Sequence, residues 1–388
     1  MRSPVDGSTT KKTITTGDLV GTVLAGARHD LTDAQWQLLE PLLPAVSGRG
    51  RPRTGTWRQL IDGIRWRVRS GTPWRDVPER YGSWQSIYGL FRRWQRDGTW
   101  AAILAGLQQL GDAAGLICWD VSVDSTLVRA HQHAAGARRD PASQVEPPGA
   151  EPVDHALGRS RGGWTTTLHL ACEQGRKPLS MVITAGHRGD SPQFVRVLER
   201  IRVRRPGRGR PRTRPDRVLA DKAYSSRANR AYLRRRGIRA TIPTKRDQQA
   251  HRRKRGSRGG RSPRFDPDIY RQRHAVEASI NLHKQNRAVA TRYEKLALRY
   301  EATTHIAGIN IWLRRLVNTR DRPEWPASPR ASSASSHTRV ATALTVCSAS
   351  AGSRTSPASA MSSALPAARA AATAPVAAAA LPGRSPAR

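Results

Sequence analysis

The first third of the chain carries apolar residues at helical spacing. The pattern starts at about residue 31, where Thr32 can cap a helix bearing Trp36 and several leucines. A second helix is predicted over 57–71, and a third over about 83–96, with Ser83 as its cap. A short helix and a turn at Tyr81-Gly82 precede the third helix. Two helices across a tight glycine turn are typical of a helix-turn-helix.

After residue 115 the pattern changes to short apolar runs. Three strands are predicted first: one over 116–126, then "TTTLHLACEQ" and "KPLSMVITAG", joined near Gly175. A helix over 191–203, a strand over 216–224, a helix ended by Gly237 and a fifth strand, "IRATIPT", follow. Long helices are expected over about 267–286 and 304–317. This order predicts an α/β fold, an RNase H-like core with a mixed sheet flanked by helices, behind an all-α, helix-turn-helix-like region.

Changes in composition suggest the domain limits. Residues 1–28 have no clear periodicity and are interpreted as a flexible arm. A helical domain is predicted over 29–110 and an α/β domain over 115–318, with a basic, Gly-rich loop at 245–268. Residues 321–388 are rich in Ala, Ser and Pro and lack large apolar side chains, so a disordered tail is expected.

The chain is strongly basic, with 67 Lys and Arg against 29 Asp and Glu and a formal net charge of +38. Such a charge favours a polyanionic partner, usually nucleic acid. A GC-rich genome would explain why Arg exceeds Lys, but not why acidic residues are few. The predicted tail holds only seven arginines, so most of the charge belongs to the part expected to fold.

Other composition features exclude several classes of protein. The three cysteines are far apart and form no Cys-x-x-Cys pair, which argues against a zinc site and a disulfide framework. No apolar segment follows Lys11 and Lys12, so no secretory signal is predicted. The Ala-rich stretch near 370–382 is interrupted by prolines, so no membrane helix and no membrane partner are expected. A cytoplasmic protein is indicated.

Acidic residues are scarce, so those near the ends of predicted strands need an explanation. Asp124 lies at the end of the first strand, Asp221 at the end of the fourth, and Glu277 in the long helix after it. Ligand sites form at strand ends in α/β sheets. Converging carboxylates would repel one another unless cations such as Mg²⁺ lay between them, and two such ions support phosphodiester chemistry. The alternative is that each acid alone caps a helix or lies on the surface.

One helix carries the most specific pattern. Its polar residues are spaced three, four and seven apart, so that they share one broad face: Tyr270, Arg273, Glu277 and Lys284. A carboxylate for metal would then be flanked by cations for DNA phosphates. An ordinary charged helix surface in a basic protein is the alternative.

The spacing Tyr-x2-Arg-x3-Glu-x6-Lys resembles the signature of the insertion-sequence DDE transposases of families four and five. Further segments resemble family-five members in family order: "LTDAQWQLLEPLLP", "GTPWRDVPERYGSWQSIYGLFRRW", "VDSTLVRAHQHAAGARR", "ITAGHRGDSPQF", "LADKAYSS" and "RHAVEASINLHKQNRAVATRYEKLA". The resemblance covers residues 29–318 and implies an RNase H-like catalytic domain behind a DNA-binding helical region.

The resemblance also implies roles for individual residues. The matching catalytic and metal-binding triad is Asp124, Asp221 and Glu277. The matching residues that hold and orient the DNA end are Tyr270, Arg273 and Lys284. All six positions are intact, which favours an active enzyme.

The implied activity is that of a bacterial, nucleoid-associated transposase. It would bind terminal inverted repeats, cleave double-stranded DNA with Mg²⁺ or Mn²⁺, with two ions expected, and join the ends to target DNA. Pairing of two ends suggests a homodimer. Two alternatives stay open: an RNase H-like nuclease that cuts without rejoining, and a regulator or decayed copy that binds DNA without catalysis.

Five other residues are candidates of lower specificity. Arg92 and Arg93 lie on the outer face of the third helix and could contact bases or phosphates, or simply be solvated. His131 and His133 could touch metal or DNA, although His-x-His on a loop is more often structural. Asp190 is expected to cap the helix 191–203, or to border the site.

Overall fold

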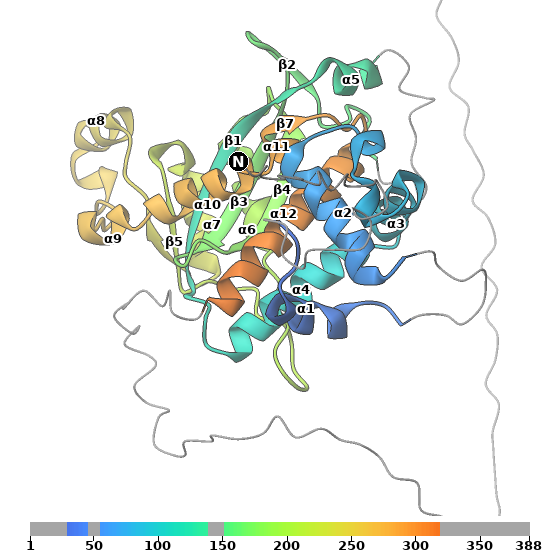
Figure 1. Cartoon of the computed structure of the whole chain (residues 1–388). Helices are drawn as coiled ribbons and strands as arrows, with labels where there is room; N and C mark the ends of the chain where they lie inside the picture. The colour runs from blue at the N-terminus through green and yellow to red at the C-terminus, as the bar shows by residue number, and fades with distance from the viewer. Residues whose placement is uncertain (1–28, 46–54, 139–150, 319–388) are drawn as a thin grey trace, which may run out of the picture. The chain divides into compact units, whose positions relative to one another are not determined.

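The computed structural model describes residues 29–45, 55–138 and 151–318 (Figure 1). All of them belong to one compact unit, in which helices pack on a mixed sheet. The predicted arm at 1–28 and tail at 321–388 lie outside the described residues. The division of the described part into a DNA-binding and a catalytic domain stays a prediction.

Helices make up the N-terminal part of the described chain. The predicted caps are confirmed, because the hydroxyls of Thr32 and Ser83 accept the backbone N–H groups of Gln35 and Ser86. The short helix expected before Gly82 is instead two 3₁₀ turns. Gly82 follows the second of them and has a φ of 97°. The elements are α1 (Asp33–Leu39), η2 (Glu40–Leu42), α2 (Trp57–Ser70), η3 (Trp74–Asp76), η4 (Glu79–Tyr81), α3 (Trp84–Arg96) and α4 (Thr99–Ala113).

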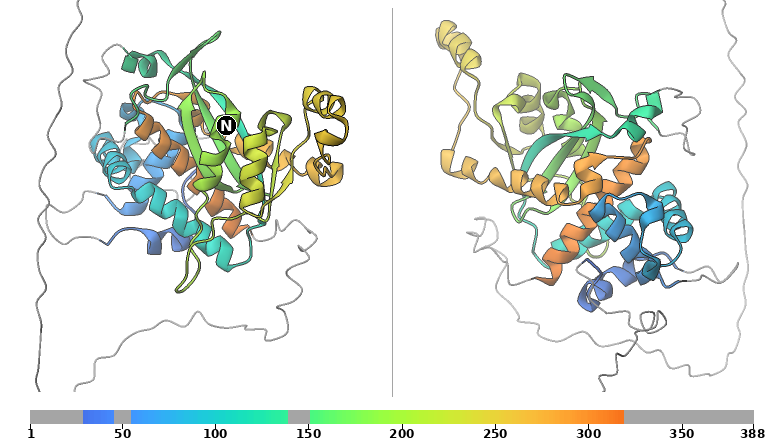
Figure 2. Two further views of the ribbon diagram at one scale, coloured as in Figure 1. Left: turned by 180° about the vertical axis from the view of Figure 1, so that it is seen from behind. Right: turned by 45° about the horizontal axis from the view of Figure 1, so that its top comes forward.

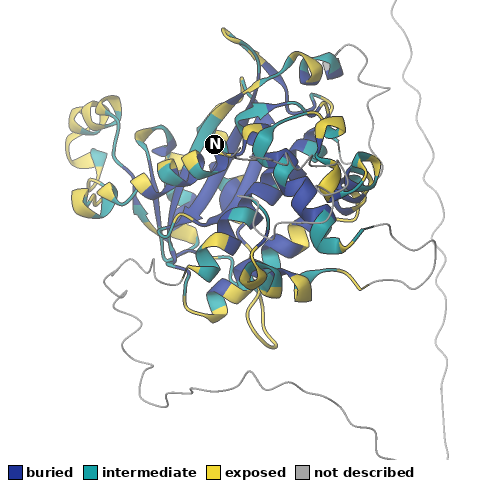
Figure 3. Ribbon diagram, viewed as in Figure 1, coloured by how far each residue is buried: buried dark blue, intermediate teal, exposed yellow. Residues whose placement is uncertain are grey.

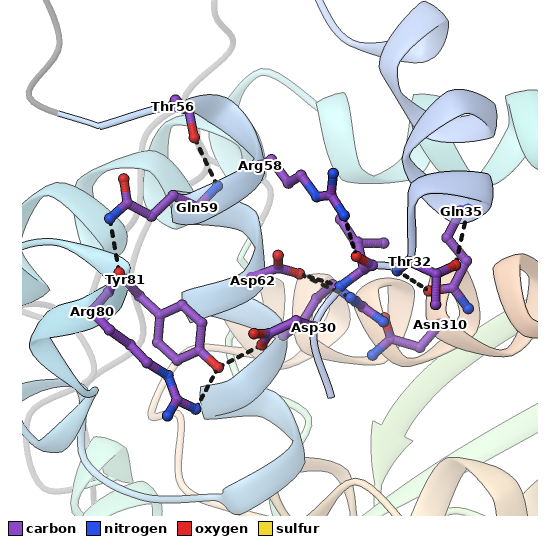
Figure 4. Close-up of polar contacts among 12 residues, drawn as sticks. Asp30, Thr32, Gln35, Thr56, Arg58, Gln59, Asp62, Arg80, Tyr81 and Asn310 are labelled. Carbon is purple, nitrogen blue, oxygen red and sulfur yellow. Dashed lines mark hydrogen bonds and ion pairs between the residues drawn. The ribbon is translucent and has the colours of Figure 1, made fainter. Parts of the chain in front are cut away.

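Polar contacts join the first helices to the last one, α12 (Ala297–Val317) (Figure 4). The guanidinium of Arg65 donates to Asp62 at 3.0 Å within α2 and to Asn310 of α12 at 2.7 Å. The backbone N–H of Leu31 donates to the same Asp62 carboxylate at 2.9 Å. The N-terminal helices are therefore fixed to an element near the other end of the described chain.

The sheet has seven strands in the described part of the chain. They are β1 (Asp120–Ala130), β2 (Gly158–Ser160), β3 (Gly163–Glu173), β4 (Pro178–Ala185), β5 (Arg217–Ala220), β6 (Arg239–Thr241) and β7 (Thr291–Arg292). β1 pairs antiparallel with β3, and β3 pairs antiparallel with β4. On its other side β1 pairs parallel with β5, and β5 pairs parallel with β6. The order β4-β3-β1-β5-β6 is that of an RNase H-like core, so the predicted fold class is confirmed.

Helices and 3₁₀ turns follow the strands. They are α5 (Gln132–Ala135), η5 (Gly136–Arg138), α6 (Asp190–Glu199), η6 (Lys222–Tyr224), α7 (Arg227–Arg235), α8 (Arg246–Lys254), η7 (Gly256–Gly259), α9 (Pro267–Arg271), α10 (His274–Lys284) and α11 (Arg287–Ala290). Gly237, with a φ of 64°, follows α7 as predicted.

Three predicted segments differ in the structure. The expected helix over 267–286 is divided into α9 and α10, and the helix expected from 304 begins at residue 297. The segment 245–268, predicted as a loop, contains α8 and η7. Its helix has almost no apolar residue, so it gave no hydrophobic period, although Arg, Lys and Gln are good helix formers.

The buried core lies between the sheet and the helices that cover it (Figure 3). Trp94 of α3 and Trp312 of α12 are among its largest fully buried side chains. The indole N–H of Trp312 donates to the carbonyl of Pro178 at the start of β4, at 2.8 Å. Within the described ranges, no helix combines the length and the apolar character needed to cross a membrane.

Candidate active site

Asp124 and Asp221 come from neighbouring parallel strands. Val123 of β1 is the register partner of Ala220, the last residue of β5, so the next residue of each chain segment is one of the two aspartates. The prediction that Asp124 lies at the end of its strand is wrong, because β1 continues against β3 as far as Ala130. Asp124 lies where the parallel pairing with β5 stops. Asp221 directly follows the end of β5, and its carboxylate caps η6 by accepting the N–H of Ala223 at 2.8 Å.

Glu277 reaches the same place from α10, which packs on β1 and β3. It lies in the first turn of α10, and its exposed carboxylate pairs with Arg273 one turn earlier. The other guanidinium nitrogen of Arg273 donates to the Asp124 carboxylate at 2.9 Å. One cation thus joins β1 to α10, and we call Asp124, Asp221 and Glu277 the acid cluster.

Burial and neighbouring charges both shift the pKa values of the residues at the acid cluster. Burial raises the pKa of Asp124 above its usual range, and the negative charge of Asp221 raises it further, whereas Arg273 opposes both. Burial lowers the pKa of Arg273, but the charges of Asp124 and Glu277 outweigh it and raise that pKa overall. The acids therefore need a positive charge between them, which Arg273 supplies.

The remaining signature residues are placed less closely. The Tyr270 ring lies on α9, with its centroid 5.9 Å from the Arg273 guanidinium carbon and 5.3 Å from the Phe265 ring centroid. Lys284 ends α10, seven residues after Glu277, which is about 10 Å along a helix. Tyr270 therefore supports Arg273 directly, whereas Lys284 lies two turns away from the cluster.

The lower-specificity candidates have other positions. The ring nitrogen Nδ1 of His131 accepts the backbone N–H of His133 at 3.3 Å and caps α5, which supports the structural interpretation. Asp190 is the first residue of α6 rather than its cap, which is Gly189. Arg92 and Arg93 line a pocket on the outer side of α3, away from the acid cluster.

Sequence reasoning missed a buried polar contact of Asp190. His169 of β3 lies with its Nδ1 3.7 Å from the Asp190 carboxylate, and its Nε2 is 2.9 Å from the Thr184 hydroxyl. Asp190 and Asp124 both add to the rise in the pKa of the buried Tyr224, a rise due first to burial. A histidine within an apolar strand, followed by an Asp at a helix start, was the available signal, but only the fold brings them together.

The donor chemistry of the cluster suits a divalent metal. Within the described part of the chain, no three acidic, histidine or cysteine side chains lie close enough to hold a metal ion as they stand. The cluster nevertheless consists of carboxylates alone, the hard oxygen donors that Mg²⁺ prefers. The cation of Arg273 bridges two of them. The residues present therefore fit a divalent ion if Arg273 releases them.

Acid is expected to destabilise the protein through two buried imidazoles. Burial lowers the pKa of His169 and of His283, on the buried side of α10, from 6.5 to about 4 in each case. Between pH 6.5 and about pH 4 the unfolded chain binds more protons than the folded one, so the free energy of unfolding falls as the pH falls through this range. The loss is up to about 3 kcal/mol per imidazole, to be measured by urea unfolding at about pH 7 and about pH 4.5.

His283→Gln is expected to remove part of this pH dependence, because the side chain no longer titrates. Exposed His133 supplies the control, and His133→Gln should leave the slope of stability against pH unchanged. A slope in His283→Gln as steep as that of the wild-type protein would contradict the expectation.

The sheet has the RNase H-like order, carboxylates lie beside its central strand, and the chain has a net charge of +38. These features together are typical of one class of protein, the enzymes that cut or transfer nucleic-acid strands. The chain matches two families. Residues 119–309 match the transposase DDE domain, and residues 31–104 match a family described as a putative transposase of the IS4/5 family.

Individual relatives agree with these matches. A putative transposase for insertion sequence element IS6501 of Brucella ovis is 31% identical over 150 residues, which are 39% of this chain and 99% of that protein. An uncharacterized protein, y4sN, of Sinorhizobium fredii is 41% identical over 28% of this chain and 83% of its own length. A putative transposase for insertion sequence element IS402 of Burkholderia cepacia is 31% identical over 26% of this chain and 44% of its own length.

The chain therefore belongs to the DDE transposases of insertion sequences, in the IS4/5 group. Members of this family cut and transpose DNA with divalent metal ions, and the enzyme class predicted from the sequence is confirmed.

Proposed function

We propose that this transposase recognises the terminal inverted repeats of its insertion sequence and cuts the DNA at the acid cluster. The observation that carries the proposal is the contact of Arg273 with both Asp124 and Glu277, beside Asp221. A strand and a helix far apart in sequence meet there on one positive charge, and Asp221 follows the neighbouring strand β5. Carboxylates contributed by separate elements in this way can hold the cations that phosphodiester chemistry uses.

Asp124, Asp221 and Glu277 would hold Mg²⁺ or Mn²⁺, with two ions expected. When bound, the ions would activate the attacking oxygen and stabilise the leaving one. Arg273 then exchanges its carboxylate partners for an oxygen of the DNA phosphate, which its planar guanidinium can bind through two N–H groups. Tyr270 packs beside that guanidinium, and Lys284 binds a phosphate farther along α10.

The reaction consists of two transfers at phosphorus. Water attacks first, the bond from phosphorus to the 3′ oxygen breaks, and the element end is left with a 3′-hydroxyl. That hydroxyl then loses its proton and attacks a phosphate of the target DNA: a bond from phosphorus to the element's 3′ oxygen forms, and the bond from that phosphorus to the target's own 3′ oxygen breaks, which leaves a 3′-hydroxyl on the target strand. No covalent bond between protein and DNA forms, so Tyr270 does not act as the nucleophile.

Recognition belongs to the helical region in this proposal. Arg92 and Arg93 of α3 contact bases or phosphates of the inverted repeat, and two protomers hold the two ends as a homodimer. The protein acts in the bacterial cytoplasm, on the nucleoid. Catalytic and recognition surfaces thus lie on different elements of one compact unit.

The test uses the purified full chain and labelled duplexes that carry the DNA flanking its reading frame. We expect cleavage at the element end with Mg²⁺ and none with a chelator. Joining of pre-cleaved ends to a plasmid separates a transposase from a nuclease that only cuts. Repeat binding with no metal-dependent nicking would contradict the proposal and identify a regulator or a decayed copy.

A further inference from the structure

A second basic feature lies outside the acid cluster, between α7 and residues 245–268, which follow β6 and which we call the basic segment. A cavity of about 720 Å³ opens there. Most of its charged lining is arginine, and we call it the arginine groove. Its arginines are Arg227, Arg230 and Arg234 of α7, Arg252 and Arg255 at the end of α8, and two more within residues 261–264.

The charge of the arginine groove is uncompensated. None of the described residues that line it is acidic, and none of its arginines forms an ion pair with a described carboxylate. Burial lowers the pKa of Arg230, and the like charges of Arg252 and Arg234 lower it further. Seven guanidinium groups around one cavity repel one another, so an anionic ligand would stabilise the arrangement.

The basic segment is held in place by hydrogen bonds to Ser225, the residue that follows η6. The Gln248 amide of α8 accepts the Ser225 hydroxyl at 2.9 Å and donates to the Ser225 carbonyl at 2.7 Å. Arg230 donates to the same hydroxyl at 3.0 Å and to the carbonyl of Ile242 at 2.8 Å. The groove is therefore built on fixed backbone, although the outer surface of α8 is exposed (Figures 1 and 3).

The groove begins next to the acid cluster. Ser225 lines it and follows Asp221 by four residues through η6, roughly 8 Å at the rise of a 3₁₀ helix. Successive phosphates of a DNA strand are farther apart in space than their rise of about 3.4 Å along the helix axis, because the strand winds around that axis. A strand whose scissile phosphate lies at Asp221 would therefore reach the groove at a neighbouring phosphate.

We propose that the arginine groove binds the phosphate backbone of the DNA strand that continues from the cleavage site. Guanidinium groups are suited to phosphate oxygens, and a chain of phosphates fits an elongated set of like charges better than a single small anion does. The assignment rests on the proposed function for the position of the scissile phosphate, but it adds a binding site that the acid cluster and α3 do not include.

The test compares two double variants of the full chain that lose the same charge. Arg252→Gln with Arg255→Gln removes two groove arginines, whereas Arg253→Gln with Lys254→Gln removes two exposed cations of the same segment outside the groove. The probe is a fluorescein-labelled DNA duplex of mixed sequence, and the measurement is its affinity as a function of salt. Each lost phosphate contact lowers the slope of log K against log salt by about 0.9.

We expect the groove variant to lose about two from that slope and the control to keep the wild-type slope, with equal thermal unfolding midpoints. Equal slopes for both variants, whether lowered or unchanged, would overturn the groove assignment. Metal-dependent cleavage of the element end by the wild-type protein is measured in parallel. Its absence would count against the proposed function, whereas normal cleavage with equal slopes would count against the groove alone.

Discussion

Asp124→Asn is expected to abolish DNA cleavage while leaving DNA affinity close to that of the wild-type protein. The change keeps the shape of the side chain but removes the negative charge that Arg273 now holds at 2.9 Å. Metal ions contribute several kcal/mol of transition-state stabilisation, and each 1.36 kcal/mol is a factor of ten in rate. A loss of roughly 10³-fold or more is expected in single-turnover cleavage of a labelled element end.

Asp221→Asn and Glu277→Gln are expected to behave in the same way. Asp120 provides a matched control, because it lies on the same strand four residues earlier and pairs with Arg217 at 3.3 Å, outside the acid cluster. Asp120→Asn should retain cleavage. Wild-type rates in Asp124→Asn, with DNA binding intact, would show that the cluster is not catalytic.

The second large effect is expected in stability, at a buried ion pair between α2 and the loop after β7. Arg67 donates to Glu294, and only 5% of each side chain is exposed. Arg67 also donates to the Thr72 carbonyl at 3.2 Å and lies over the Trp74 ring. Arg67→Met leaves Glu294 buried without its partner, which costs about 3–5 kcal/mol of unfolding free energy.

Urea denaturation followed by tryptophan fluorescence measures this loss. Adding Glu294→Leu to Arg67→Met should recover part of it, because the buried carboxylate that lost its ion-pair partner is then removed as well. The exposed pair Arg271–Asp268 supplies the comparison, and Arg271→Met should cost less than about 1 kcal/mol. An equal cost for Arg67→Met and Arg271→Met would contradict the importance of burial.

The elements with regular patterns were predictable from the sequence. The helices α2 and α3 have clear apolar periods, and caps such as Ser83 mark where helices begin. The strands around β1 are recognisable as short apolar runs. The helix α8 was not predictable, because it packs through the Gln248 amide rather than through an apolar face. The break between α9 and α10 was missed because the polar spacing around Arg273 continues across it.

The candidate site was predictable as a set of residues but not as a geometry. The motif spacing identified Glu277 and Arg273 on one segment, and two apolar runs ending in acids identified Asp124 and Asp221. The contact of Arg273 with Asp124 spans 149 residues and depends on how α10 packs against β1. No local pattern carries that information.

The attachment of α12 to the N-terminal helices has a consequence for synthesis of the protein. Arg65 of α2 bonds to Asn310, and Gly111 of α4 faces the Trp312 ring so closely that a Cβ there would lie 2.4 Å from it. These partners belong to α12, the last described helix to be synthesised. The helical region therefore cannot complete its packing until α12 has left the ribosome, and a nascent chain that stops before α12 exposes the apolar surfaces of α2 and α4.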